Sequence, residues 1–464
     1  MGWRGALIGG VASVALLGPG WAWAQSLEEA LVSAYANNPT LQAQRAKVRS
    51  TDEGVPQALA NWRPKISVDG SVASQAYYNY AATAGTTAYG QHRDPKSVGA
   101  SLTQSLFRGF RTLNETDRAE LKVLAERARL ASTEQDILSK AATSYLDVVR
   151  EQATLELNRG NEQVLRRQLE AARDRFRVGE ITRTDVHQAE ARVAKAQADR
   201  IQAENNLEAS RATYANYVGE AAGKLARPGM PTDLPVSKDE ALKVATVAYP
   251  LVQAAELDSA ASDKYVDVVR GELMPSLDLS AKASKDYDSS AEDNRINTLE
   301  GKLTLTVPLY EKGSVYSRLR EAKQLAAQDR HKTDKERRDA REKAVRAWEQ
   351  LESARARVDS YGAQIRASEI ALEGVEKEAA VGSRTVLDVL DAEQEVLDAK
   401  VNLVKAQRDE LVAIFDLKAA MGQLTAEKLN LRAAIYNPLA HYNEVRDKWF
   451  GGSSSGDISD KPVK

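Results

Sequence analysis

The chain contains the stretch Val178-Gly179-Glu180-Ile181-Thr182-Arg183-Thr184-Asp185-Val186 and, 203 residues further on, the related stretch Val381-Gly382-Ser383-Arg384-Thr385-Val386-Leu387-Asp388-Val389. Both begin with Val-Gly and end with Asp-Val. The same spacing separates Gly219 from Gly422. One offset that holds across this much sequence indicates an internal duplication.

The beginning of each copy repeats at a slightly larger spacing. The segment Ser26–Leu31 recurs 211 residues later as Ser237–Leu242, and Pro64 recurs as Pro275. The change in spacing places eight additional residues of the first copy between Pro64 and Leu102, where an exposed loop would accommodate them. The predicted units are a first structural repeat, 25–236, a second structural repeat, 237–436, and a C-terminal periplasmic tail, 437–464, that is flexible from about residue 451.

Long helical segments form most of each copy. From Ala340 to Ala379, apolar or small residues recur at alternating spacings of three and four, which is typical of coiled-coil packing. At 1.5 Å per residue, 312–380 would be about 100 Å long, and 384–420 and 250–273 would be about 56 and 36 Å long. We therefore expect two stacked short helices beside one long helix in each copy. In the first copy the corresponding segments are 110–178, 183–218 and 39–61.

Between the first short helix and the long helix, each copy changes from the helical period to a period of two. Apolar residues alternate with polar ones from Leu277 to Ala283 and from Leu299 to Val307, and the first copy does the same from Ile66 to Val72 and from Val98 to Leu106. This period predicts four β-strands with one apolar face each. Their length of about ten residues matches that of transmembrane β-strands.

The pattern of the helices indicates whether these strands lie in a membrane or in a soluble sheet. Four strands cannot close a barrel in lipid, where every edge must be paired, so several chains would have to contribute. The alternative is a soluble sheet in a periplasmic coiled-coil scaffold without channel activity. The narrow, alanine-rich helical seams offer no broad apolar face to cover such a sheet, which favours the membrane pore.

The composition excludes several classes of function, and the N-terminus indicates export from the cytoplasm. The chain has 64 Lys and Arg against 66 Asp and Glu, too neutral for a nucleic-acid-binding surface, and it has no cysteine for a thiolate nucleophile or a Cys-based zinc site. Arg4, the apolar stretch 6–17 and Ala22-Trp23-Ala24 predict a signal peptide, 1–24. That apolar stretch is too short to span a membrane as a helix.

Signatures of catalysis are missing from the sequence. Residues 452–456 fit the pattern G-x-S-x-G, but they lie in the predicted flexible tail, without the strand and helix that a nucleophile elbow needs. The histidines His92, His187, His331 and His441 are dispersed and do not form i, i+4 pairs. The sequence therefore predicts no enzyme, no cofactor and no metal site.

Several motifs together resemble a known family. The strand exits Gln104–Gly109 and Val307–Tyr310, the two Val-Gly stretches and the closing Tyr436-Asn437-Pro438 resemble TolC-like outer-membrane channel tunnels. The resemblance implies an α+β membrane protein and a homotrimer in outer-membrane lipid. Four transmembrane strands per chain would form a shared 12-stranded β-barrel, continued by a long coiled-coil α-helical barrel in the periplasm.

The same resemblance implies a function. Such a protein would be the passive outer-membrane exit duct of a tripartite efflux or type I secretion system. It would open at its periplasmic end on engaging a periplasmic adaptor, or membrane fusion protein, and an inner-membrane transporter of the ABC or RND type. The sequence leaves open whether the cargo is drugs or a secreted protein, which transporter and adaptor are used, and whether the resting state is open or closed.

The second Val-Gly stretch contains the main candidate site. Asp388 and Asp391 are three residues apart on one helical face, and Arg384 lies one turn earlier. The simpler interpretation is that acids in a first helical turn stabilise the helix dipole. The resemblance implies instead that Asp388 and Asp391 form the periplasmic gate and a cation-binding ring.

The resemblance also implies links that hold this gate closed. Arg384 would bind Thr184 and Asp185, and Gln168 and Glu376 match a second link. Ala379 stands where relatives have an aromatic hydroxyl, which puts that part of the closure in doubt.

The two turn glycines match the place where adaptor hairpins dock. Gly179 and Gly382 are the residues concerned. A tight turn that requires a positive φ would by itself account for a glycine at each position.

Overall fold

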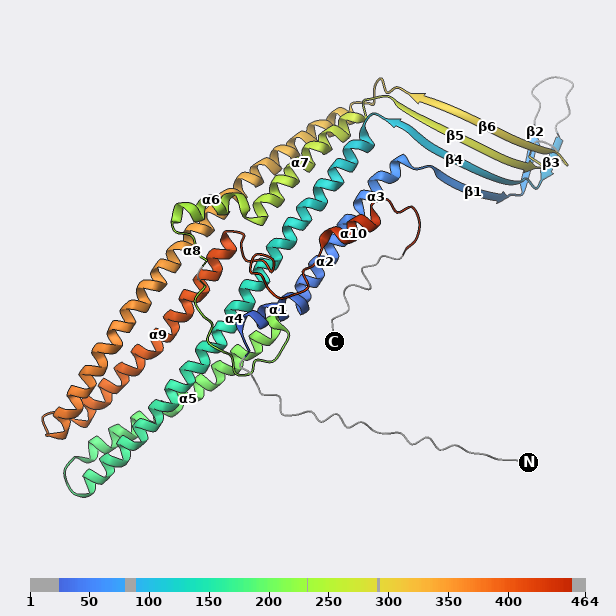
Figure 1. Ribbon diagram of the computed structural model, residues 1–464. Coiled ribbons are helices and arrows are strands. Elements are labelled where there is room, and N and C mark those ends of the chain that lie inside the picture. Colours follow the sequence, from blue (N-terminus) through green and yellow to red (C-terminus); the bar gives the residue numbers. More distant parts are fainter. Residues whose placement is uncertain (1–24, 80–88, 232, 290–292, 453–464) are drawn as a thin grey trace, which may run out of the picture.

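The protein is a long column of helices with a β-sheet at one end (Figure 1). The computed structural model describes residues 25–79, 89–231, 233–289 and 293–452. The predicted signal peptide, 1–24, lies outside these residues, as do 80–88 of the longer loop and 453–464 of the predicted tail. Among the described helices, none is both long enough and apolar enough to cross a membrane.

The same order of short helices, long strands, long helix and medium helix occurs twice along the chain, and the first copy has α3, η1 and the hairpin β2–β3 in addition. The first series is α1 (Leu27–Asn37), α2 (Pro39–Asp52), α3 (Gly54–Leu59), η1 (Ala60–Trp62), β1 (Lys65–Val72), β2 (Gln75–Asn79), β3 (Tyr89–Arg93), β4 (Lys96–Arg108), α4 (Arg111–Arg177) and α5 (Arg183–Val218). The second is α6 (Lys238–Ala248), α7 (Pro250–Gly271), β5 (Ser276–Tyr287), β6 (Arg295–Thr306), α8 (Ser314–Ala380) and α9 (Val386–Ala420), followed by α10 (Pro438–Val445).

The predicted helix lengths are confirmed, with one exception. The long helices α4 and α8 have 67 residues each, and each packs against shorter helices placed along it (Figure 1). The segment 39–61 was predicted as one helix, but α2 ends at Asp52 and α3 begins at Gly54. Pro56 explains the interruption, because it has no N–H to donate to the carbonyl group of Asp52.

The coiled-coil seam of the second long helix is confirmed by burial. Ala340, Ala344, Ala347, Leu351 and Ala354 are all nearly inaccessible to solvent. Helix α8 packs mainly against α9, α7 and α6, which lie along it. The first copy follows the pattern less strictly, because Leu124 is exposed.

The four long strands form one antiparallel sheet in the order β1-β4-β5-β6, and β2 pairs with β3 as a separate hairpin beyond its far end (Figure 1). The register places polar residues opposite polar residues on one face. Ser67 is opposite Ser101, and their hydroxyl oxygens are 2.8 Å apart. Ser105 donates a hydrogen bond to Asp278 at 2.6 Å.

The other face of this sheet is apolar and uncovered. Val68 lies opposite Ala100, and Ala283 lies opposite Leu299. The exposed fractions are 76% for Val68 and 89% for Leu299, values expected of loop residues rather than of a sheet packed on a core. No described helix covers this face, so its apolar side chains require another environment.

The sheet joins the helices through a close backbone contact. Gly109 lies between β4 and α4 with φ +61°, and Gly271 is the last residue of α7. A Cβ atom added to Gly109 would lie 2.3 Å from the carbonyl oxygen of Gly271, and one added to Gly271 would lie 2.4 Å from that of Gly109. Only glycine fits at both positions, so this contact fixes how the strands leave the helical column.

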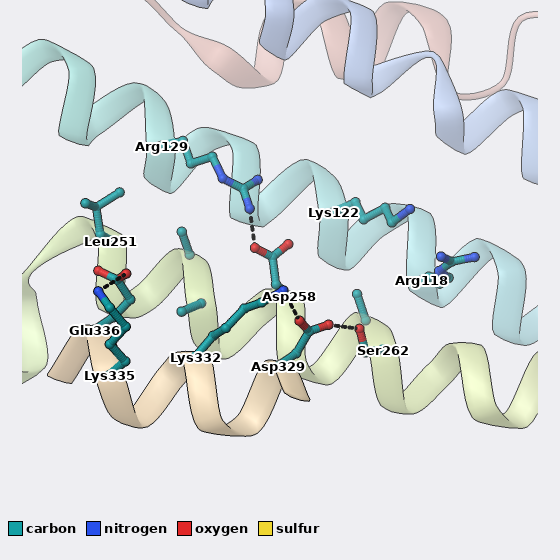
Figure 2. Close-up of a pocket in the computed structure, with 13 residues that line it drawn as sticks. Arg118, Lys122, Arg129, Leu251, Asp258, Ser262, Asp329, Lys332, Lys335 and Glu336 are labelled. Atoms are coloured by element: carbon teal, nitrogen blue, oxygen red, sulfur yellow. Dashed lines mark hydrogen bonds and ion pairs between the residues drawn. The ribbon is translucent and has the colours of Figure 1, made fainter. Parts of the chain in front are cut away.

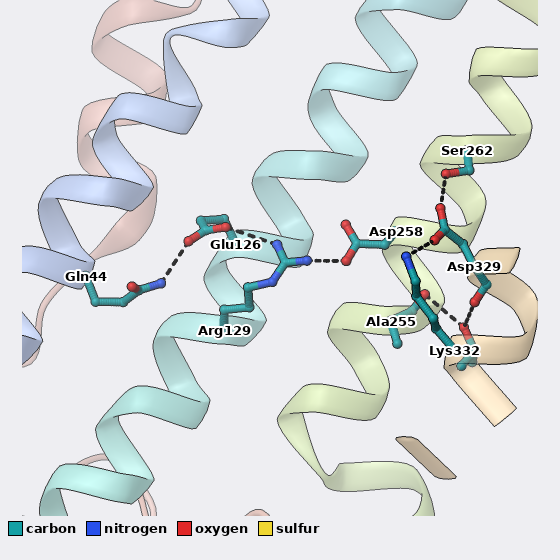
Figure 3. Close-up of polar contacts among 9 residues, drawn as sticks. Gln44, Glu126, Arg129, Ala255, Asp258, Ser262, Asp329 and Lys332 are labelled. Atoms are coloured by element: carbon teal, nitrogen blue, oxygen red, sulfur yellow. Dashed lines mark hydrogen bonds and ion pairs between the residues drawn. The ribbon is translucent and has the colours of Figure 1, made fainter. Parts of the chain in front are cut away.

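Polar side chains tie four neighbouring helices together across the column (Figure 3). Gln44 of α2 donates a hydrogen bond to Glu126 of α4 at 2.8 Å. Arg129, also on α4, binds Glu126 at 3.0 Å and forms an ion pair with Asp258 of α7. Ser262 of α7 then donates to Asp329 of α8.

The C-terminal helix α10 lies against α2 (Figure 1). His441 Nδ1 is 3.2 Å from Asp52 Oδ2, and both side chains are buried. Arg127 of α4 is 3.6 Å from the other Asp52 oxygen and stacks on Tyr442. Burial raises the pKa of Asp52, while its contacts with His441 and Arg127 act in the opposite direction.

Candidate gate at the helical tips

Each pair of long and short helices ends in a tip of the same construction. In the first tip Gly179 has φ +82°, and the N–H of Glu180 bonds to the carbonyl of Arg175 at 2.9 Å. In the second, Gly382 also has φ +82°, and Ser383 bonds to Glu378 at 3.0 Å. Both are helix ends of the Schellman type. A Cβ added to either glycine would meet nothing within 4 Å, so φ alone requires glycine there.

The helices that leave the tips begin with capping boxes. Thr182 caps α5 and pairs with Asp185, and Thr385 caps α9 and pairs with Asp388. The carboxylate of Asp388 accepts the Thr385 N–H at 2.9 Å and its hydroxyl at 2.8 Å. These hydrogen bonds hold the pKa of Asp388 below its usual value, so this candidate gate residue carries a negative charge at neutral pH.

Asp391, the second candidate acid, has a different environment. It is exposed on α9 and forms an ion pair with Arg192 of α5. This pair joins the two tips of one chain. Of the two acids, only Asp391 forms an ion pair with a lysine or arginine in the described structure, although the charge of Arg384 also acts on Asp388 and lowers its pKa.

Within one chain, Arg384 has a different partner from the one that the resemblance implies. Arg384 Nε binds Glu378 Oε2 of its own tip at 2.9 Å. Asp185 is engaged in the cap of α5, and Thr184 is exposed beside it. Within the described part of the chain, no hydrogen bond or ion pair joins Arg384 to Thr184 or Asp185.

The other predicted link pairs Gln168 with Glu376, but within the described chain Gln168 binds a third residue instead. Gln168 of α4 donates a hydrogen bond to Glu393 of α9 at 3.3 Å, and Glu376 of α8 is close enough to act on the same carboxyl group. Burial raises the pKa of Glu393, and the charge of Glu376 raises it further. The second Glu393 oxygen is buried without a hydrogen-bond partner in the described structure.

Sequence reasoning missed both Glu393 and Arg192. Glu393 lies seven residues after Val386 and three before Val396, so it occupies a seam position of α9, where a carboxylate is unusual. That position could have identified it. Arg192 gives no comparable signal, because exposed arginines are common along all of these helices.

A column of paired helices that carries an uncovered, apolar-faced sheet at one end defines the class of outer-membrane channels with a helical periplasmic tunnel. The family model described as "Outer membrane efflux protein" matches residues 30–220 and 242–423. The chain belongs to this family.

Two curated relatives match almost the whole chain. The outer membrane efflux protein BepC of Brucella suis is 36% identical over 93% of this chain and 92% of its own length. The outer membrane protein TolC of Vibrio cholerae is 28% identical over 87% of this chain and 92% of its own length. The protein is thus an outer-membrane exit duct whose helices form a long periplasmic extension. Family membership favours this role over the scaffold without channel activity.

A solved structure agrees on the fold. The CmeC outer membrane channel of Campylobacter jejuni superposes with a TM-score of 0.76, covering 91% of this chain and 89% of its own, at 15% sequence identity. At this identity the likeness concerns the fold alone. Membership of an efflux family also means that the protein works with adaptors and inner-membrane transporters.

Proposed function

We propose that three chains assemble into one channel, in which their sheets close into a 12-stranded barrel in outer-membrane lipid. The observation that carries this proposal is the sheet itself. In the described structure, β1 and β6 pair on one side only, and the face with Val68 and Leu299 is uncovered. Pairing β1 of one chain with β6 of the next would satisfy the open edges, and lipid would cover the apolar face.

The test of this proposal is the assembly state. The protein purified in detergent should contain three chains, measured by light scattering corrected for bound detergent, and should conduct ions in a planar bilayer. A monodisperse single chain that conducts would contradict the shared barrel. A trimer without conductance would contradict the duct.

The helical tips are the proposed periplasmic entrance of a tripartite efflux or type I secretion system. In a closed trimer Arg384 would leave Glu378 and bind Thr184 and Asp185 of a neighbouring chain, with several donors in a planar fork. The hydrogen bond from Gln168 to Glu393 would hold α4 and α9 of one chain together, and a link from Gln168 to Glu376 would have to replace it. An adaptor that docks at Gly179 and Gly382 would open the entrance by competing for these contacts.

The acids of the second tip should make the entrance selective for cations. Three copies of Asp388 and Asp391 would lie around one axis, where like charges repel unless cations sit among them. Changing both to Asn keeps the side chain at Asp388 capable of accepting hydrogen bonds. We expect this double variant to weaken the block of current by multivalent cations from the periplasmic side at least about tenfold, or about 1.4 kcal/mol.

A variant of Arg192 should change the cation block in the opposite direction. Arg192→Gln removes the positive charge that is paired with Asp391, so it should strengthen the cation block, measured in the same bilayer experiment. If multivalent cations block the wild type and both variants equally, Asp388 and Asp391 do not form a cation-binding ring and only stabilise the start of α9.

A further inference from the structure

A cavity of about 480 Å³ lies between α4, α7 and α8, away from the tips (Figure 2). Small residues of α7, among them Ala254 and Ala261, line it on one side. Charged side chains form the walls. Helix α4 contributes Arg118, Lys122 and Arg129, and α8 contributes Lys332 and Lys335 with the acids Asp329 and Glu336.

Two of the three acids on the walls are closely paired with cations, and the third has a more distant one. Asp258 of α7 pairs with Arg129. Asp329 binds Lys332 at 2.8 Å and accepts a hydrogen bond from Ser262. Glu336 lies 4.0 Å from Lys335, whose amino group is held mainly by Asp339 at 2.5 Å.

Two cations remain without such a partner. Arg118 stacks on the ring of Tyr265 at 4.1 Å, and its Nε is buried without a hydrogen-bond partner. Lys122, one turn further along α4, makes no hydrogen bond or ion pair with any residue that the structure describes. The nearby Glu115 is occupied, since it accepts a hydrogen bond from Asn61 at 2.9 Å and pairs with Arg108.

This arrangement is electrostatically unfavourable for the empty cavity. Burial lowers the pKa of both Arg118 and Lys122, and the charge of Arg118 lowers that of Lys122 further. The charge of Glu115 acts in the opposite direction on Arg118, as does that of Asp258 on Lys122. Like charges one helical turn apart repel. Arg118 is half-buried, so protein atoms replace part of the water around it, whereas Lys122 is exposed and water screens its side of the repulsion. An anion bound between them would remove the repulsion and would supply an acceptor for the orphaned Arg118 Nε.

We propose that this cavity binds a phosphate group, with Arg118 and Lys122 as its ligands. A guanidinium group and an ammonium group together recognise a doubly charged oxyanion, the first through its fork of donors and the second as a point charge. Arg118 is seven residues into α4, about 10 Å from the helix start next to the sheet. A soluble phosphate ester and the phosphate of a lipid headgroup are the two possible sources of this group.

The test is a titration of the full protein in phosphate-free detergent solution. One arm adds inorganic phosphate, and the other adds phosphatidylglycerol, with phosphatidylcholine for comparison; binding is measured by calorimetry. We expect saturable binding in at least one arm, weakened at least tenfold by Lys122→Gln and by Arg118→Gln. Lys335→Gln is the matched control: it removes a cation from the same cavity whose charge is already matched, so it should bind as the wild type does.

Thermal unfolding separates a ligand from a merely structural role. Without phosphate, Lys122→Gln should unfold at the wild-type temperature or above it, because it removes a repulsion. With the bound probe, only the wild type and Lys335→Gln should gain stability. Binding in the lipid arm alone would assign the site to a headgroup. No binding in either arm, or equal binding in the wild type and the Lys122 and Arg118 variants, would overturn the proposal.

Discussion

Leu299→Arg should abolish stable insertion of the protein into the outer membrane. Leu299 lies in the middle of β6 with 89% of its surface exposed, on the apolar face of the sheet. An arginine on the lipid face of a transmembrane barrel costs about 2–4 kcal/mol near the bilayer midplane. A trimer would carry three such residues. The amount of the variant in the outer-membrane fraction, measured by immunoblotting, should fall to a small part of the wild-type amount.

The adjacent residue provides the control for this variant. Thr298 is next to Leu299 in β6 but is on the polar face, opposite Ser284. Thr298→Arg adds the same charge to the same strand and should insert normally, because that face would meet water. If both variants insert equally well, the apolar face does not meet lipid and the strands have another role.

Gly109→Ala should strongly destabilise the folded protein. The new Cβ would lie 2.3 Å from the carbonyl oxygen of Gly271 and 2.6 Å from the Cβ of Met274, and φ is +61°. Left-handed backbone costs about 1–2 kcal/mol for a residue other than glycine, and an overpacked contact adds about 1–3 kcal/mol. We expect a large fall in the midpoint of thermal unfolding of the purified protein.

Two other glycines separate these contributions. Gly313 has φ +76°, but a Cβ added there would meet open space, so Gly313→Ala should show the backbone effect alone. Gly301 has neither a positive φ nor a close neighbour, so Gly301→Ala should unfold at the wild-type midpoint. Gly109→Ala as stable as Gly301→Ala would show that the sheet can tilt away from α7 without loss.

Much of the fold follows from sequence periods. A spacing of three and four marked the buried seam of α8, and alternation marked the four long strands, because burial on one side imposes these periods directly. The break near Pro56 could have been predicted, because this proline lies inside the segment 39–61, where a continuous helix would need its missing N–H. The order β1-β4-β5-β6 depends on which edges pair, and no local pattern encodes that.

The candidate site was less predictable than the fold. The capping role of Asp388 follows from its position three residues after Thr385. The pairing of Asp391 with Arg192 could not be predicted from the sequence. The two residues are 199 positions apart in the chain, and several arginines of α5 could compete for the same carboxylate. The contact between Arg384 and Glu378 likewise depends on side-chain rotamers at an exposed turn.

The docking of α10 on α2 bears on how the chain reaches its native state. His441 and Asp52 are 389 residues apart, and the N–H of Tyr436 donates to the hydroxyl of Tyr35 over a separation of 401. Contacts between residues so far apart in the chain form slowly, because closing a large loop costs entropy before the contacts can stabilise the structure. The N-terminal half cannot complete its packing until 436–445 have been synthesised and have arrived in the same compartment. A stalled or truncated chain that lacks 436–445 would leave Asp52 without His441 and Tyr35 without Tyr436, and the surface that α10 covers would be open to proteases.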